Sequence, residues 1–127
     1  MQPSLAQPSL VQLEVGLVQN FCTLVCDPHS QSCAIVDPAF EVDRILRTVH
    51  EAGLRPCAIW LTHTHFDHIE GVAPLLQRVG AALPIFVGEQ EAEAVHSACA
   101  TAGVQPAITA LAGGEILTLG QLSAQVL

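Results

Sequence analysis

Three histidines and an aspartate lie within six residues directly after a short apolar run, and this feature constrains the fold more than any other. The segment reads Thr-His-Thr-His-Phe-Asp-His over residues 62–68, and the run before it reads Cys-Ala-Ile-Trp-Leu over residues 57–61. An apolar run of this length is typical of a strand buried inside a sheet. Because ligand and catalytic sites of α/β proteins gather at the carboxyl ends of such strands, the cluster predicts a functional site there.

The spacing within the cluster favours metal binding. His63 and His65 are two residues apart, so in an extended chain their imidazoles point to the same side and can share one metal ion. Asp67 and His68 are adjacent and need a loop or the first turn of a helix to converge on a second ion. Two ions roughly 3.5–4 Å apart can hold a bridging hydroxide, and zinc lowers the pKa of water from about 16 to about 7. Such a site would supply a nucleophile at neutral pH without a serine or cysteine.

The rest of the chain alternates between strand and helix patterns, which predicts one α/β domain with a mixed sheet. Residues 1–10 are expected to be a disordered lead-in, and residues 104–114 a loop. Strands are expected at 10–19, 21–26, 33–36, 57–61 and 84–87, with a final hairpin of 116–119 and 122–127. Helices are expected at 41–52, 72–79 and 89–102, and each is followed by a glycine, as helix ends often are.

Composition excludes several classes of function. The chain has twelve acidic residues and four basic ones, none of them lysine, for a formal net charge of −8. Nucleic acids and anionic membrane surfaces are bound mainly through Lys and Arg, so we expect neither as a partner. No apolar run approaches the roughly 18 residues that a membrane span needs.

The remaining histidines and the cysteines have ordinary interpretations. His29, His50 and His96 stand alone, and we expect them to be surface or capping residues. The five cysteines are an odd number without a C-x-x-C pair, and most of them fall in apolar patterns. We therefore expect free thiols in a reducing compartment, which predicts a cytoplasmic protein.

The Thr-His-Thr-His-Phe-Asp-His stretch resembles the T-H-x-H-x-D-H motif of the metallo-β-lactamase-fold hydrolases, and within them the glyoxalase II-like (hydroxyacylglutathione hydrolase-like) branch. Asn20, the Val36-Asp37-Pro38 segment and Gly71 also fit this family. Residues 115–120 resemble its G-D-x-L-x-L-G hairpin. The resemblance extends from about residue 11 to the last residue. It implies the N-terminal part of an αββα sandwich, with helices on one face of a mixed sheet, in a partial domain over residues 11–127.

By this resemblance, His63 and His65 would bind the first metal ion, and Asp67 and His68 the second. Asp67 would also orient the attacking hydroxide, which makes it the expected catalytic residue. Two zinc ions are expected in a complete site, with iron or manganese as alternatives. Asp37 would either fix the motif loop from behind or serve only as a turn residue.

The chain departs from the family pattern after the hairpin. The family completes its site with a histidine in an H-x-x-G-H segment, a bridging aspartate and a last histidine, and this chain ends at Leu127, where the first of these would follow. His96 is expected in the middle of a helix and is a poor substitute. Two donors per ion fall short of the three or four protein ligands of ordinary zinc sites. We therefore expect weak metal binding and slow or no turnover unless a second chain or a C-terminal half completes the site.

The resemblance implies a small-molecule substrate, a thioester of the acyl-glutathione type, which the enzyme would hydrolyse. Two alternatives remain open: an enzyme similar to the mononuclear iron persulfide dioxygenases of the same superfamily, and a non-catalytic remnant that keeps the motif by descent. A nuclease is the least favoured member of the superfamily, because the chain has so few cationic side chains.

Overall fold

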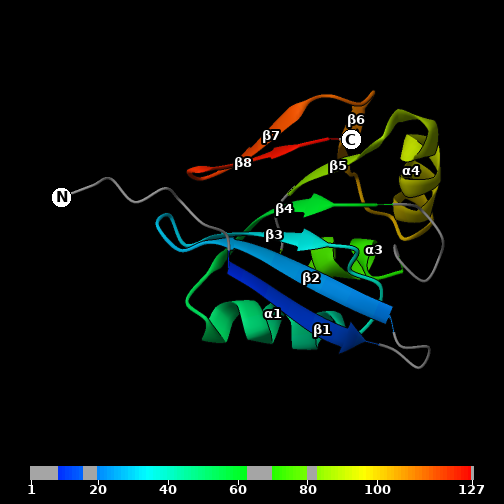
Figure 1. Ribbon diagram of the computed structural model, residues 1–127. Coiled ribbons are helices and arrows are strands. Elements are labelled where there is room, and N and C mark those ends of the chain that lie inside the picture. The colour runs from blue at the N-terminus through cyan, green and yellow to red at the C-terminus, as the bar shows by residue number, and fades with distance from the viewer. Residues whose placement is uncertain (1–8, 16–19, 63–69, 80–82, 127) are drawn as a thin grey trace.

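A six-stranded mixed sheet forms the centre of the fold (Figure 1). The computed structural model describes residues 9–15, 20–62, 70–79 and 83–126. The strands lie in the sheet in chain order. The first three pair antiparallel with one another, and the third to the sixth pair in parallel. They are β1 (Ser9–Val15), β2 (Asn20–Asp27), β3 (Ser32–Val36), β4 (Arg55–Trp60), β5 (Pro84–Gly88) and β6 (Ala107–Leu111). The predicted mixed sheet is confirmed. Its two middle strands include β4, which precedes the histidine segment, the stretch of residues 62–68 that contains the three clustered histidines.

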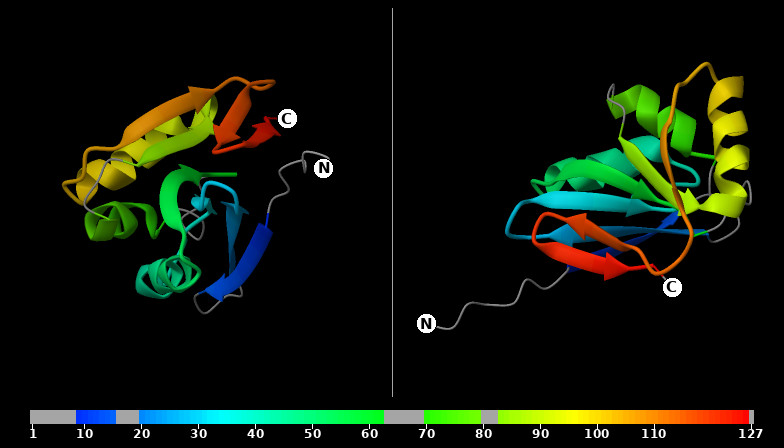
Figure 2. Two further views of the ribbon diagram at one scale, coloured as in Figure 1. Left: turned by 90° about the vertical axis from the view of Figure 1, so that its left-hand side faces the viewer. Right: turned by 90° about the horizontal axis from the view of Figure 1, so that it is seen from above.

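Three helices cover one face of the sheet, as Figure 2 shows in its left view. They are α1 (Val42–Glu51), α3 (Val72–Val79) and α4 (Ala92–Thr101), the last preceded by the 3-10 turn η1 (Glu89–Glu91). Each helix packs its apolar side on the strands; α1 does so with Val42, Ile45 and Val49. Burying one such side chain stabilises the fold by roughly 1.5–3 kcal/mol. The core therefore lies between the helices and this face of the sheet.

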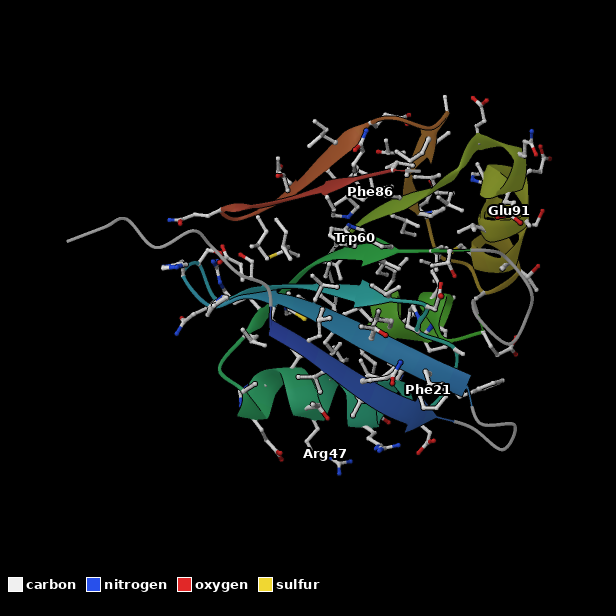
Figure 3. All side chains as sticks on the ribbon, in the orientation of Figure 1. Phe21, Arg47, Trp60, Phe86 and Glu91 are labelled. Atoms are coloured by element: carbon white, nitrogen blue, oxygen red, sulfur yellow. The ribbon has the colours of Figure 1, made fainter. Side chains whose placement is uncertain are left out.

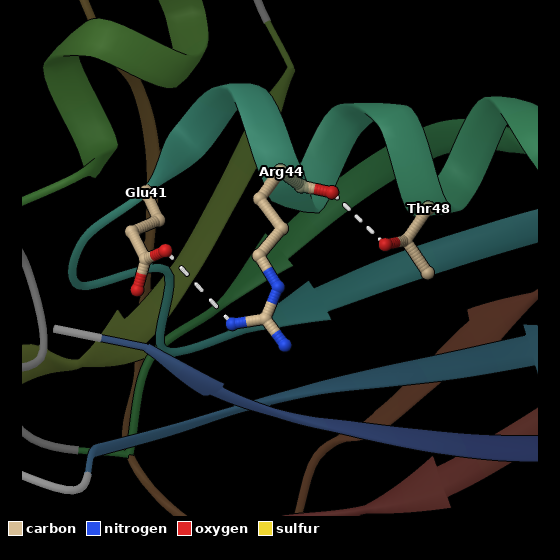
Figure 4. A network of polar contacts seen from close by, with 3 residues as sticks. All are labelled: Glu41, Arg44 and Thr48. Carbon is tan, nitrogen blue, oxygen red and sulfur yellow. Dashed lines mark hydrogen bonds and ion pairs between the residues drawn. The ribbon is translucent and has the colours of Figure 1, made fainter.

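Polar contacts of α1 lie on its exposed side. Figure 4 shows the ion pair between Glu41 and Arg44, whose atoms are 3.9 Å apart, and the hydroxyl of Thr48, which donates to the carbonyl oxygen of Arg44 at 2.9 Å. Arg78 of α3 donates to the carboxylate of Asp43 at 2.8 Å and joins the two helices. Exposed ion pairs contribute little to stability, so the position of α1 is determined by its buried side.

The opposite face of the sheet is only partly covered. A separate hairpin of β7 (Ile116–Leu119) and β8 (Leu122–Gln125) lies over it. Leu119 is buried against Ala34 and Ala58, and Figure 3 shows Trp60 and Phe86 pointing toward this hairpin. On the same face, away from the hairpin, 64% of Leu10 and 48% of Phe21 are exposed.

The hairpin is joined to the rest of the fold through the buried carboxylate of Asp27 at the end of β2. Its oxygens accept from the backbone N–H of Gln121 at 2.8 Å, the hydroxyl of Ser30 at 2.7 Å and the backbone N–H of His29 at 3.1 Å. These bonds, that of Gln121 first, lower the pKa of Asp27. Gly120 lies so close that an added Cβ would collide with the side chains of Asp27 and Ser30.

Most predicted elements are confirmed, and one was wrong. The predicted loop over 104–114 contains β6, because Ala107–Leu111 pairs in parallel with β5 at the edge of the sheet. Three of its five residues are exposed, so the segment lacks the apolar pattern of a buried strand. The helix predicted over 89–102 begins as the 3-10 turn η1. Residues 1–8, most of the predicted lead-in, lie outside the described residues. No helix in the described part of the chain is long and apolar enough to cross a membrane.

Candidate active site

The four predicted metal ligands lie outside the described residues, because His63, His65, Asp67 and His68 all fall within 63–69. Their convergence on metal ions therefore stays a prediction. The structure does describe both flanks of this segment. On one side β4 ends at Trp60 and continues into the buried Leu61 and the exposed Thr62; on the other, the buried Gly71 precedes α3. Among the described residues, no group of three or more His, Cys, Asp or Glu side chains could hold a metal ion.

Asp37 holds the beginning of the histidine segment. It follows β3 in a left-handed backbone conformation, with φ of 54°, and its N–H donates to the carbonyl of Trp60 at 3.0 Å. Its buried carboxylate accepts from the backbone N–H of Thr62 at 2.9 Å and also from the Thr62 hydroxyl. Of the two predicted roles for Asp37, these contacts support positioning of the motif loop over a turn role alone.

Pro38 contacts the chain just after the same segment. Its carbonyl oxygen accepts from the backbone N–H of Gly71 at 2.9 Å. The carbonyl oxygen of Gly71 in turn accepts from the backbone N–H of Leu75 in α3, also at 2.9 Å. A Cβ at position 71 would collide with the Pro38 carbonyl, so the close approach requires glycine. Both ends of the histidine segment are therefore attached to one dipeptide, Asp37-Pro38, which follows β3.

A cavity of about 530 Å³ opens beside Thr62, at the carboxyl ends of β4, β5 and β6. Its volume lies within the roughly 300–1,000 Å³ of ordinary small-molecule sites. The lining consists of Leu61 and Thr62, residues 88–91 at the end of β5 and in η1, residues 111–113 at the end of β6 and just after it, and Val126. The histidine segment thus leaves the sheet at the wall of a cavity large enough for a substrate.

The loop after β6 is held in shape by Glu115. The Glu115 carboxylate accepts from the backbone N–H groups of Ala112 and Gly113, each at 2.6 Å, and these bonds lower the pKa of Glu115. The Gly114 N–H donates to the carbonyl of Val126, and the Val126 N–H to the carbonyl of Glu115, both at 2.8 Å. Glu115 stands where the family pattern has aspartate, and the sequence alone did not reveal this role. The bonds fix one wall of the cavity and place Val126 in it.

The isolated histidines take no part in this cavity. His29, His50 and His96 are exposed, as predicted for surface residues. His96 lies on α4 and lines two other surface hollows, between α4 and β6 and at the end of α4. None of the three borders the cavity beside Thr62.

The cysteines are free thiols, as predicted. Cys22, Cys26, Cys33 and Cys99 are buried, and Cys57 is partly exposed. Burial raises the pKa of Cys22 to about 12, with a smaller contribution from the charge of Asp37, and burial likewise raises the pKa of Cys33. Thiols held in this way are poor nucleophiles, and none of the five lines the cavity.

Known proteins resemble the chain over most of its length. It is 35% identical over 111 residues to a hydroxyacylglutathione hydrolase of Bradyrhizobium sp. (strain ORS 278). The aligned region covers 87% of this chain and 39% of that protein. It is 28% identical over 108 residues to the probable polyketide biosynthesis zinc-dependent hydrolase PksB of Bacillus subtilis (strain 168). This aligned region covers 85% of this chain and 44% of PksB. The chain therefore spans about two fifths of the length of these relatives.

A solved structure also resembles the chain over most of its length. TTHA1623, crystallised in a di-iron-bound form, superposes with a TM-score of 0.65 at 29% identity, over 84% of this chain and 56% of the other. The family model of the metallo-beta-lactamase superfamily matches residues 15–98, a span that contains β2 to β5, the histidine segment and its two anchors. With more than half of its residues matched, the chain belongs to the metallo-beta-lactamase superfamily.

Proposed function

We propose that this chain supplies the first half of the active site of a metal-dependent hydrolase that cleaves thioesters of the acyl-glutathione type. The observation that carries the proposal is the attachment of both ends of the histidine segment to Asp37-Pro38, beside a cavity of about 530 Å³. A buried carboxylate that fixes a ligand-bearing loop is common behind metal sites, because it orients the ligands.

The donor set of the segment suits zinc. His63 and His65 would hold one ion, and Asp67 and His68 the other, since imidazole nitrogens and carboxylate oxygens are ordinary zinc ligands. When bound, two zinc ions supply an acidified water and polarise the scissile carbonyl. Asp67 would orient that water for its attack, and Thr62 would keep the beginning of the segment against Asp37. The cavity lining would exclude bulk water from the substrate.

We propose that further polypeptide completes the site, either a C-terminal half of the same protein or a second chain. Two features support this proposal. Val126 lies in the wall of the same cavity as Thr62, so residues that follow it in a longer protein would enter the cavity. The face that carries Leu10 and Phe21 exposes both of these large apolar side chains, and such side chains are suited to packing against a second sheet. On its own, the 127-residue chain would bind metal weakly and turn over slowly or not at all.

The thioester substrate rests on the name of the Bradyrhizobium relative, a hydroxyacylglutathione hydrolase. The cytoplasm is the proposed compartment, since all five cysteines are free and glutathione thioesters belong to reducing surroundings. A mononuclear iron enzyme similar to the persulfide dioxygenases is the second candidate, and the di-iron-bound form of TTHA1623 supports only its choice of iron as the metal.

The test compares this chain with any longer product of its reading frame. We expect the longer form to bind two zinc ions and to hydrolyse S-lactoylglutathione, and His63→Ala and Asp67→Ala to abolish both without changing the circular dichroism spectrum. His96→Ala, an exposed histidine outside the cavity, is the matched control and should keep full activity. Iron content with oxygen uptake on a persulfide would establish the second candidate instead. A longer form without any metal would overturn both.

A further inference from the structure

Two buried cysteines face each other across the hairpin that β2 and β3 form. Cys26 and Cys33 are directly opposite in the antiparallel register, and only 2% and 0% of them are exposed. Their sulfur atoms are 3.8 Å apart, and the thiol of Cys26 donates to the sulfur of Cys33. The thiol of Cys33 in turn donates to the carbonyl oxygen of Ala34 at 3.7 Å. The pair lies outside the cavity beside Thr62, and the hydrolase function proposed above makes no use of it.

The backbone of these two residues already has the geometry that a disulfide requires. Residues directly opposite each other on antiparallel strands have Cα atoms about 4.5 or 5.5 Å apart, and disulfides span Cα distances of about 4.4–6.8 Å. Cys26 and Cys33 can therefore be joined without a movement of the strands. Their sulfur atoms need to approach by roughly 1.8 Å, which rotation of the two side chains can supply.

The other three cysteines are less well placed to bond to this pair. Cys22 lies four residues before Cys26 on the same strand, roughly 13 Å away along it. Cys57 packs on the face of the sheet that carries the β7–β8 hairpin, whereas Cys26 and Cys33 belong to the core on the helix side. Cys99 lies on α4, which packs against β6, three strands away from β3. The folded chain therefore favours one disulfide over the others.

A disulfide at this place would close the turn that holds the β7–β8 hairpin. Residues 27–32 join the two cysteines, and Asp27 in this turn accepts from the backbone N–H of Gln121 at 2.8 Å. The bond between Cys26 and Cys33 would close a loop of eight residues. Such a loop restricts the unfolded chain, so it favours the folded state when the native geometry accepts it.

We propose that Cys26 and Cys33 form a reversible redox site, whose disulfide cross-links the β2–β3 hairpin and stabilises the fold under oxidising conditions. Two S–H bonds break and one S–S bond forms, while the two electrons and two protons reduce one molecule of a small disulfide, oxidised glutathione, to two thiols. In a reducing compartment the site stays in the dithiol form until the ratio of oxidised to reduced glutathione rises. Burial raises the pKa of both thiols, so the exchange is slow, and its equilibrium is the quantity to compare.

The test measures the equilibrium between dithiol and disulfide in the 127-residue chain. The chain is equilibrated with mixtures of reduced and oxidised glutathione, folded in buffer or unfolded in urea, starting from either form. Acid quenching, alkylation and mass spectrometry after cleavage before Asp27 quantify the bond between Cys26 and Cys33. We expect the equilibrium constant for closure to be about 10-fold larger or more in the folded chain. By linkage, the oxidised chain should then unfold at a urea midpoint about 0.5 M higher or more than the reduced chain.

Matched variants separate this pair from the other thiols. Cys22→Ala, at a buried position of the same strand, and Cys57→Ala, at the partly exposed cysteine, should keep the 10-fold ratio. Cys33→Ser should remove both the disulfide and the dependence of the urea midpoint on glutathione. An equal or smaller constant in the folded wild-type chain, or pairing of Cys26 or Cys33 with another cysteine there, would overturn the inference. These measurements need neither metal nor turnover, so their outcome is independent of the hydrolase proposal.

Discussion

The carboxylate of Asp37 accepts two hydrogen bonds from Thr62, one from its backbone N–H and one from its hydroxyl. Asp37 follows β3 and Thr62 follows β4, so the pair joins two neighbouring strands at the point where the histidine segment begins. Each hydrogen bond to a charged group contributes about 1.5–3 kcal/mol, and a partner left without one adds a desolvation cost.

Loss of the Asp37 carboxylate should therefore weaken both stability and metal binding. We expect Asp37→Ala to lower the free energy of unfolding by about 2–4 kcal/mol and to weaken metal affinity about 10–100-fold in the complete protein. Urea unfolding and zinc titration measure the two effects. Thr62→Val should show part of the same loss, and Thr62→Ser, which keeps the hydroxyl, should not. Equal metal affinity in Asp37→Ala and the wild type would show that Asp37 serves the turn alone.

Gly71→Ala should separate the end of the histidine segment from Pro38. The new Cβ would collide with the Pro38 carbonyl, so either the Gly71–Pro38 hydrogen bond or the start of α3 must move. We expect a loss of more than about 1 kcal/mol in the free energy of unfolding. The matched control is Gly88→Ala, because Gly88 has φ of −55° and nothing within 4 Å of an added Cβ. If the two variants unfold at the same urea concentration, Gly71 is not needed for the close approach.

Asp27→Asn should destabilise the protein in a manner that depends on pH. Hydrogen bonds from Gln121 and Ser30 hold the pKa of Asp27 below that of an unfolded aspartate, which is about 3.9. Its contribution is therefore complete above pH about 4 and is lost as the pH falls toward the lower folded-state pKa. The difference in urea midpoint between the wild type and Asp27→Asn should be constant from pH 5 to 7 and shrink below about pH 4. Glu51→Gln, at an exposed position of α1, is the comparison. A difference that grows on acidification would contradict this account.

The cysteines should differ in their reaction with iodoacetamide. With its pKa near 12, Cys22 exists as thiolate in only about one molecule in ten thousand at pH 8. The partly exposed Cys57 should therefore be alkylated first, and the buried Cys22 and Cys33 only on unfolding. Mass spectrometry of peptides over time gives the order, and Cys57→Ala should remove the fast phase. Fast labelling of Cys22 in the folded protein would show that β2 opens readily.

The sequence predicts best those elements whose own pattern decides their structure. Helix α1 repeats its apolar residues at helical spacing, and the last four residues of β4, Cys57 to Trp60, form an uninterrupted apolar run. By contrast, β6 becomes a strand because β5 offers it hydrogen bonds, and its exposed residues 107, 109 and 110 carry no strand pattern. Local patterns do not contain such non-local pairing.

The same distinction applies to the candidate site. The ligand-bearing segment stands out in the sequence because four metal-binding side chains cluster there. The anchors Asp37 and Pro38 lie more than twenty residues upstream of Thr62 and Gly71, and their contacts depend on β3 and β4 being neighbours in the sheet. The sequence shows Gly71 as part of a family pattern, and only the fold shows that the Pro38 carbonyl occupies the space of its missing side chain.

The two attachments to Asp37-Pro38 also separate the scaffold from its reactive part. Thr62 and Gly71, on either side of the clustered histidines, are fixed to Asp37 and Pro38, so side chains between them could be exchanged while these two points stay where they are. A frame of this kind permits one architecture to acquire different ion preferences through a few local substitutions, without redesign of its hydrophobic interior.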